Sequence, residues 1–117
     1  MEKIKVLLLL IIALLHLYFM VLEMFYWDKP YGMRVFGMTE EQAKFSKVLA
    51  QNQGLYNGFL SAGLVWAAIW QNQSVAMFFL TCVFIAGVYG AFTTKNKRIF
   101  YVQGLPALIA TFIILLT

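Results

Sequence analysis

Residues 6–27 read VLLLLIIALLHLYFMVLEMFYW, and this almost wholly apolar stretch decides the fold class. Its length matches the roughly 20 residues that an α-helix needs to cross the hydrocarbon core of a bilayer. Lys3 and Lys5 precede it, as they would in a secretory signal, but no small-x-small cleavage site ends the apolar run. We therefore interpret residues 6–27 as a retained membrane-spanning helix.

The rest of the chain carries three further apolar segments, at about residues 48–70, 75–93 and 99–116. Only 12% of the 117 residues are charged and 62% are hydrophobic. Soluble domains usually carry about 25% charged residues. This composition excludes an ordinary soluble domain. We expect one all-α domain over residues 1–117, an integral membrane four-helix bundle embedded in the lipid bilayer.

Basic residues are divided unequally between the two sides of such a bundle. The side that holds both termini carries Lys3 and Lys5. The other side carries Lys29, Arg34, Lys44, Lys47, Lys95, Lys97 and Arg98. Because basic loops stay in the cytoplasm, we expect both termini to lie outside and the two longer loops to lie in the cytoplasm. The net charge of +4 thus comes from loops beside membrane helices, and no nucleic-acid partner is expected.

Residues 28–47 connect the first two spans and have an organisation of their own. Residues 29–32 read Lys-Pro-Tyr-Gly and predict a turn, and Gly37 predicts a second break. Thr39 and Gln42 have the spacing of a capping box, which starts a helix. We expect a short cytoplasmic interfacial helix there, which leads into the second span.

Two ionisable side chains, His16 and Glu23, interrupt the first span. Their separation is about two helical turns, so both lie on one face, ~10 Å apart along the axis. An ionisable group inside the bilayer costs roughly 2.5–3.5 kcal/mol even on lenient scales, so such groups point towards partners or a cavity. The pair therefore marks a candidate site.

Polar residues in the other three spans cluster towards the same, cytoplasmic, half of the bilayer. The second span opens with the amide-rich run NQGLYNG at residues 52–58. The ligand- or proton-binding candidates are His16, Glu23, Asn52, Gln53, Tyr56, Asn57, Tyr89 and Gln103. We expect Glu23, Asn57 and Gln103 to line one cavity with Asn52, and His16 to lie at its floor. The alternative is that these groups only hold the helices together, as amides do in many membrane proteins.

Several short motifs together resemble a bacterial membrane-protein family, the one catalogued as domain of unknown function 1304. The motifs are HLY at 16–18, LEMFYW at 22–27, NQGLYNGFL at 52–60, AGVYGA at 86–91 and QGLPA at 103–107. The resemblance covers nearly the whole chain. It implies a small four-helix integral membrane protein and supplies no activity. With the orientation expected from the loop charges, the resemblance implies a multi-pass protein of the bacterial inner membrane with both termini outside.

The candidate residues restrict the chemistry. A metal centre needs three or four donors, and the spans offer only His16, Glu23 and Cys82, with Cys82 towards the outer half. We therefore expect no metal. No glycine-rich phosphate loop is present, and we expect no cofactor.

Three functions remain open. The first is binding or transport of a small lipophilic or amphipathic molecule, in which its charge is exchanged for a proton. The second is an intramembrane acid/base enzyme, with isomerase or epoxide-type chemistry on a hydrophobic substrate. The third is a structural or partner-binding subunit. Small-residue faces at Gly54 and Gly58, or at Gly87 and Gly90, would also allow a homo-oligomer.

Overall fold

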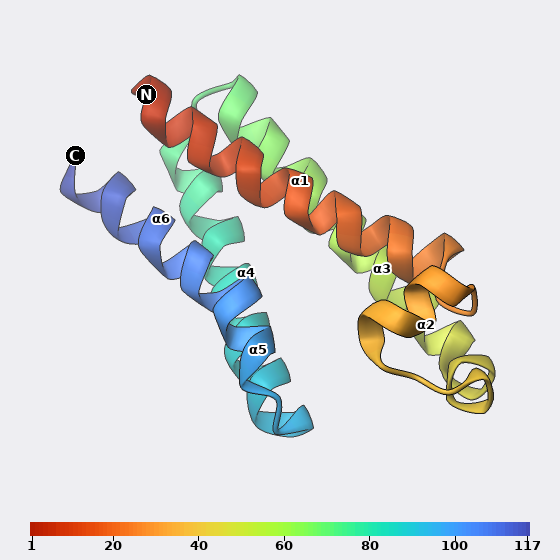
Figure 1. Cartoon of the computed structure of the whole chain (residues 1–117). Coiled ribbons are helices and arrows are strands. Elements are labelled where there is room, and N and C mark those ends of the chain that lie inside the picture. Colours follow the sequence, from red (N-terminus) through yellow and green to blue (C-terminus); the bar gives the residue numbers. More distant parts are fainter. The chain divides into compact units, whose positions relative to one another are not determined.

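The computed structural model describes the whole chain, from Met1 to Thr117, and every regular element in it is helical. In chain order these are α1 (Lys3–Phe25), α2 (Pro30–Phe36), α3 (Glu40–Ile69), α4 (Gln73–Thr94), α5 (Lys97–Ile99), the π-helix η1 (Phe100–Gly104) and α6 (Leu105–Leu116) (Figure 1). The predicted all-α class is confirmed.

Three helical stretches are long and apolar enough to cross a membrane: Lys3–Phe25, Gln73–Thr94 and Lys97–Leu116. They fall on the first, third and fourth of the predicted spans, and the chain is a helical membrane protein. The helix α3 contains the second predicted span but is not among the three. Charged residues occupy its first turns and amides follow them, which lowers its hydropathy.

The connection between α1 and α3 differs from the prediction in two respects. The residues expected to form a turn begin a helix instead, because α2 starts at Pro30. Proline suits the first helical position, where its missing N–H is not needed. The expected short interfacial helix is not separate either: the residues after Thr39 are the first turns of α3, which continues to Ile69.

The two boundary signals in this connection are confirmed. Gly37 ends α2 in the left-handed conformation, with φ of 63°. Thr39 and Gln42 form the capping box. The Gln42 backbone N–H donates to Thr39 Oγ1 at 3.1 Å, and the Thr39 N–H donates to Gln42 Oε1 at 3.0 Å. These reciprocal bonds satisfy donors that the start of a helix leaves unpaired.

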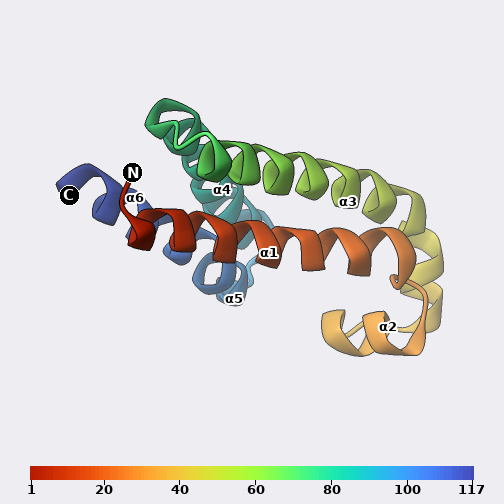
Figure 2. The same ribbon diagram turned by 90° about the horizontal axis from the view of Figure 1, so that it is seen from above.

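The chain forms two compact units, one of residues 14–61 and one of residues 1–13 with 62–117. In the unit of residues 14–61, α1 and α3 lie side by side (Figure 2). A Cβ added to Gly54 would lie 2.5 Å from Met24 Cγ, and one added to Gly58 would lie 2.9 Å from Met20 Sδ. Moving forward along α3 therefore means moving back along α1, so the two helices are antiparallel.

Helix α2 belongs to the same unit and packs on the end of α1. A Cβ on Gly32 would lie 1.9 Å from the carbonyl oxygen of Tyr26, so only glycine permits this approach. The hydroxyl groups of Tyr18 and Tyr31 are hydrogen-bonded at 2.5 Å. Since Tyr18 lies about two turns before the end of α1, α2 folds back along that helix.

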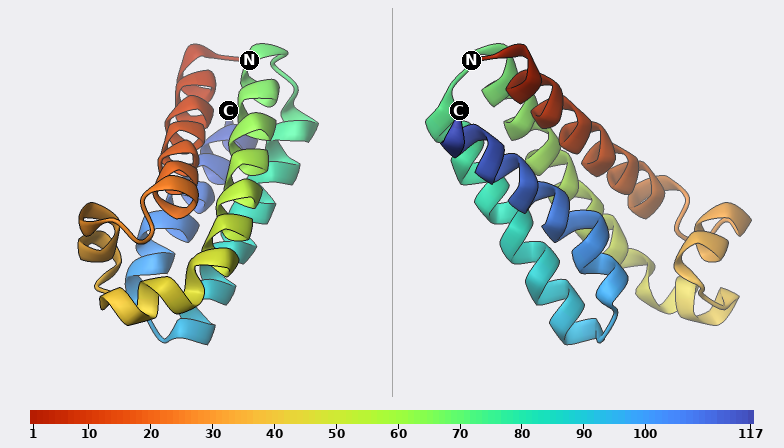
Figure 3. Two further views of the ribbon diagram at one scale, coloured as in Figure 1. Left: turned by 90° about the vertical axis from the view of Figure 1, so that its right-hand side faces the viewer. Right: turned by 60° about the vertical axis from the view of Figure 1, so that its left-hand side comes forward.

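In the other unit, α4 lies beside the continuous stretch from α5 to α6 (Figure 3). Two glycines allow the backbones to come close, since a Cβ on Gly87 would lie 2.5 Å from the backbone nitrogen of Gly104. Small and branched side chains fill the interface, and the fully buried ones on these helices include Leu80, Val83, Ala107 and Ala110. Backbone proximity, rather than large side chains, sets the spacing of this pair.

The π-helix η1 explains how the last span accommodates Pro106. A proline is tolerated in the first turn of a helix and otherwise causes a kink. Because the helical stretch already begins at Lys97, Pro106 lies inside it and not in its first turn. Inside an α-helix, proline lacks the N–H and clashes with the carbonyl one turn back. The turn before Pro106 is widened instead, and the Leu105 N–H donates to the carbonyl of Phe100, five residues back.

Threonine side chains on the last two spans bond to their own helices. The hydroxyl groups of Thr81, Thr93, Thr94, Thr111 and Thr117 donate to backbone carbonyls four residues earlier, at 2.5–2.8 Å. This local pattern is common for threonine in helices. Because each of these five hydroxyl groups already has an acceptor, none of them needs a partner from another helix.

Candidate functional site

Glu23 and Asn57 meet between α1 and α3, and the Asn57 side-chain amide donates a hydrogen bond to Glu23 Oε1. Both side chains are half-buried. The contact depends on Gly54, one turn before Asn57, because a Cβ there would lie 3.1 Å from the Cβ of Glu23. The amide-rich motif thus contributes two things: a glycine that brings the helices together and an amide that binds the carboxyl group.

His16 lies on the same face of α1, about two turns from Glu23, and is 0% exposed. Its ring and that of Phe19 form a T-shaped pair, with ring centroids 5.5 Å apart. On α3, Ser61 is also buried, at 6% exposure. In the antiparallel register, Gly58 faces Met20, so Ser61 lies at the level of His16. These two residues form a second polar level inside the α1–α3 pair.

Ser61 was not among the predicted site residues. The signal that identifies it is its position four residues after Asn57, on the same face of α3. Serine is common on close-packed membrane helices, and sequence alone does not separate a buried one from a lipid-facing one.

The other candidates on α3 are exposed. Asn52, Gln53 and Tyr56 lie on the surface, with Tyr56 61% exposed. The Asn52 side-chain amide donates to the carbonyl of Val48 on its own helix, at 3.0 Å. The structure therefore brings Asn57 to Glu23 and does not bring Asn52 or Tyr56 there.

The remaining two candidates belong to the other unit. Tyr89 on α4 is 59% exposed, and Gln103 in η1 is half-buried. The glycines expected to serve a homo-oligomer are used within the chain: Gly54 and Gly58 face α1, and Gly87 faces Gly104. A shared cavity for all the candidates, and homo-oligomer formation, stay predictions.

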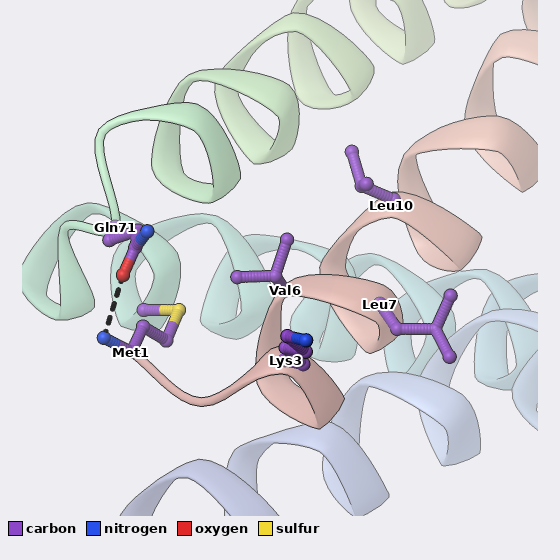
Figure 4. A pocket seen from close by; sticks show the side chains of 6 residues that line it. All are labelled: Met1, Lys3, Val6, Leu7, Leu10 and Gln71. Atoms are coloured by element: carbon purple, nitrogen blue, oxygen red, sulfur yellow. Dashed lines mark hydrogen bonds between the residues drawn. The ribbon is translucent and has the colours of Figure 1, made fainter.

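A surface hollow lies elsewhere, at the start of α1. It encloses about 320 Å³ and is lined by Met1, Lys3, Val6, Leu7, Leu10 and Gln71 (Figure 4). Two of these residues are bonded to each other, since the Met1 ammonium group donates to Gln71 Oε1 at 2.8 Å. Four of its six lining residues are apolar, so the hollow offers few polar groups for binding a ligand.

At the opposite end of α1, an ion pair holds the start of the connection to α3. Lys47 Nζ lies 2.9 Å from Asp28 Oδ2. The hydrogen bond from Lys47 lowers the pKa of Asp28 below its ordinary value. Next to it, the Trp27 ring N–H donates to Ser46 Oγ at 3.0 Å. Two neighbouring side chains of α3, Ser46 and Lys47, are thus fixed to Trp27 and Asp28, the second and third residues after α1.

This ion pair predicts a pH dependence of stability. The pKa of Asp28 is lowered on folding, so the pair stabilises the fold at neutral pH and loses its effect as the pH falls below the ordinary carboxyl value of about 4. We expect the melting temperature in detergent to fall less between pH 6 and 3 for Asp28→Asn than for the wild type, as measured by circular dichroism. Equal slopes for the two proteins would show that the pair does not affect stability.

Comparisons with known proteins support one family. The sequence profile described as "Protein of unknown function (DUF1304)" matches residues 10–115. The chain is also similar to "Uncharacterized protein YpaA" of Lactococcus lactis subsp. lactis (strain IL1403), with 34% identity over 114 residues that cover 94% of this chain and 95% of that protein. No solved structure matches the chain.

Proposed function

Since this chain belongs to the DUF1304 family, whose description gives no function, we propose a function from its own residues: it binds a small lipophilic or amphipathic molecule and carries it across the bacterial inner membrane. In this proposal, Glu23 is the group that exchanges the molecule for a proton. The observation that carries it is the hydrogen bond from Asn57 on α3 to the Glu23 carboxyl group on α1.

The chemistry of this pair supports exchange. A carboxyl group in the membrane interior is expensive, so one that is retained there usually has a role in moving ions or ligands. Glu23 can hold either a proton or a charged or polar group of a ligand, and the amide of Asn57 can donate to its oxygen in both states. Because both side chains are only half-buried, a molecule can reach them from the side of the α1–α3 pair.

Native mass spectrometry of the protein purified in detergent tests this proposal. We expect the wild type to retain a small molecule, and Glu23→Gln to retain at least about tenfold less, because a hydrogen bond to a charged group contributes about 1.5–3 kcal/mol. Glu41→Gln is the matched control, since Glu41 is an exposed residue in the first turn of α3. Equal retention by Glu23→Gln, with an unchanged helical spectrum, would leave the pair with a packing role only.

The proposal includes four membrane-spanning helices. Three of them are identified by length and hydropathy, and α3 is the fourth. At 30 residues, α3 is about 45 Å long, whereas the hydrocarbon core is about 30 Å thick. Large apolar side chains are exposed along its second half: Leu55, Phe59, Trp66 and Ile69. Its charged first turns would lie in the cytoplasmic interface, and both termini would then be outside.

Cysteine labelling tests this topology. In a Cys82→Ala background, single cysteines at Tyr31 and Ser74 bracket α3, and a third at Thr94 follows α4. We expect a membrane-impermeant maleimide to label Ser74→Cys in intact cells but neither Tyr31→Cys nor Thr94→Cys. Labelling of the positions before and after α3 from the same side would mean that α3 lies on the surface and does not cross.

A further inference from the structure

The α1–α3 pair contains two polar levels with an apolar level between them. Glu23 and Asn57 form one, and His16 and Ser61 form the other. Between them, the side chain of Met20 lies over Gly58, because a Cβ on that glycine would come within 2.9 Å of Met20 Sδ and 3.6 Å of its Cγ. The polar levels are about 10 Å apart along α1, which is too far for a direct hydrogen bond.

We propose that His16 and Ser61 form a second proton-binding site, reached from Glu23 past the side chain of Met20, which acts as the gate between them. This inference rests on the proposed function, in which Glu23 holds the exchangeable proton. The group bound at the second site is a proton, because a neutral imidazole accepts one and the two side chains, 0% exposed at His16 and 6% at Ser61, leave little access for a larger ligand.

The gate follows from the chemistry of methionine. A proton moves along hydrogen-bonded groups or water, and a thioether sulfur is only a weak acceptor that cannot pass a proton on. Methionine is also unbranched and has several rotatable bonds, so it can change conformation without moving the backbone. The absence of a side chain at Gly58 leaves the space that Met20 occupies. When the thioether leaves that space, water can connect Glu23 to His16.

No charged side chain other than Glu23 lies near His16 on α1 or α3, since Lys3 and Lys5 are at the start of α1, about three turns or more before His16. Beyond Lys47, α3 carries no acidic or basic residue, and its one tyrosine, Tyr56, is exposed. On α1 the neighbouring titratable side chain is Tyr18, which is exposed and hydrogen-bonded to Tyr31. Glu23 is therefore the ionisable group on these two helices that can exchange a proton with His16 through the gate.

The chain has one histidine, so nitrogen-15 labelling of histidine reports on His16 alone. The experiment measures the exchange rate of its ring N–H with water by nuclear magnetic resonance, for the full-length protein in detergent micelles. We expect Met20→Ala to raise this rate at least about tenfold, because it opens the gate permanently. Adding Glu23→Gln to Met20→Ala should return the rate to near the wild-type value.

Met24→Ala is the matched control, because Met24 is a half-buried methionine of the same helix that faces Gly54, on the far side of Glu23 from His16. We expect its exchange rate to equal that of the wild type. Equal rates for Met20→Ala and Met24→Ala would overturn the gate. Fast exchange in Met20→Ala that persists with Glu23→Gln would overturn the route through Glu23.

A volume-conserving variant keeps the test valid if Met20→Ala does not fold. Met20→Leu retains the bulk but is branched and less flexible, so we expect slower exchange than in the wild type. Unchanged or faster exchange in a folded Met20→Leu protein would contradict the gate. Failure of this inference is distinguishable from failure of the proposed function, since ligand retention in native mass spectra depends on Glu23 and not on the exchange rate at His16.

Discussion

Gly87→Ala is expected to destabilise the protein by about 3 kcal/mol or more, the upper range for an added methyl group in a packed interface. The new Cβ would lie 2.5 Å from the backbone nitrogen of Gly104 and 2.7 Å from its Cα. Both are backbone atoms, so no side-chain rotation can relieve the clash, and α4 must separate from η1. Unfolding of the purified protein in mixed micelles, followed by circular dichroism, measures the loss.

Gly90→Ala is the control for this prediction, on the same helix and one turn later. Its Cβ would lie 3.1 Å from Cγ2 of Ile99, which is the end of a flexible side chain. The gain in helix propensity from glycine to alanine is about 1 kcal/mol, and this should offset the small adjustment that Ile99 must make. If both substitutions cost the same, the distance between the two backbones does not limit the packing of this interface.

The second large effect is expected for Gly32→Ala, which should detach α2 from the end of α1. The added Cβ would lie 1.9 Å from the carbonyl oxygen of Tyr26 and 2.7 Å from its carbonyl carbon, so α2 cannot keep its place. We expect a local loss of about 3 kcal/mol. Hydrogen exchange measured by mass spectrometry should show rapid exchange in residues 28–37 and unchanged protection in α1 and α3.

Fluorescence gives a second readout, since the ring of Trp27 lies 4.7 Å from that of Phe36 and would lose this neighbour. Gly37→Ala is the control. No atom lies within 4 Å of a Cβ at that position, but its φ of 63° strains any other residue by about 1–2 kcal/mol. Equal exchange in the two variants would mean that the contact between Gly32 and Tyr26 matters no more for the position of α2 than the backbone strain at Gly37.

Sequence was sufficient for the elements that a single signal controls. The apolar run after Lys5 predicted α1, and Thr39 with Gln42 predicted the start of α3. The sequence was misleading at Pro30 and Gly32, because both are typical turn residues and a turn was predicted there. Their roles in the structure are to start α2 and to let it contact Tyr26. The glycine at position 32 is needed because of its contact with Tyr26, and the residues next to it in the sequence do not indicate that contact.

The sequence also predicted part of the candidate site, namely Glu23 and Asn57, but it included Asn52 as well, which the structure does not bring to Glu23. Spacing placed Glu23 in a membrane helix and indicated that Asn57 could reach a neighbour, and the structure pairs them. It also grouped Asn52 with the site, although five residues on a helix turn through about 140°, so Asn52 and Asn57 cannot both face α1. Which of the two faces α1 depends on Gly54 and Gly58, whose missing side chains select the contact surface.

Four of the five threonines that bond to carbonyls one turn earlier lie within the last two spans, where they change what a lipid molecule meets. With each hydroxyl engaged at a carbonyl of the previous turn, the outward part of the side chain is its methyl group. Lipid acyl chains therefore meet a surface close to that of valine, although hydropathy scales count each threonine as polar. Threonine-to-valine replacements at these positions are accordingly a route to variants with the same lipid contacts and no hydroxyl group.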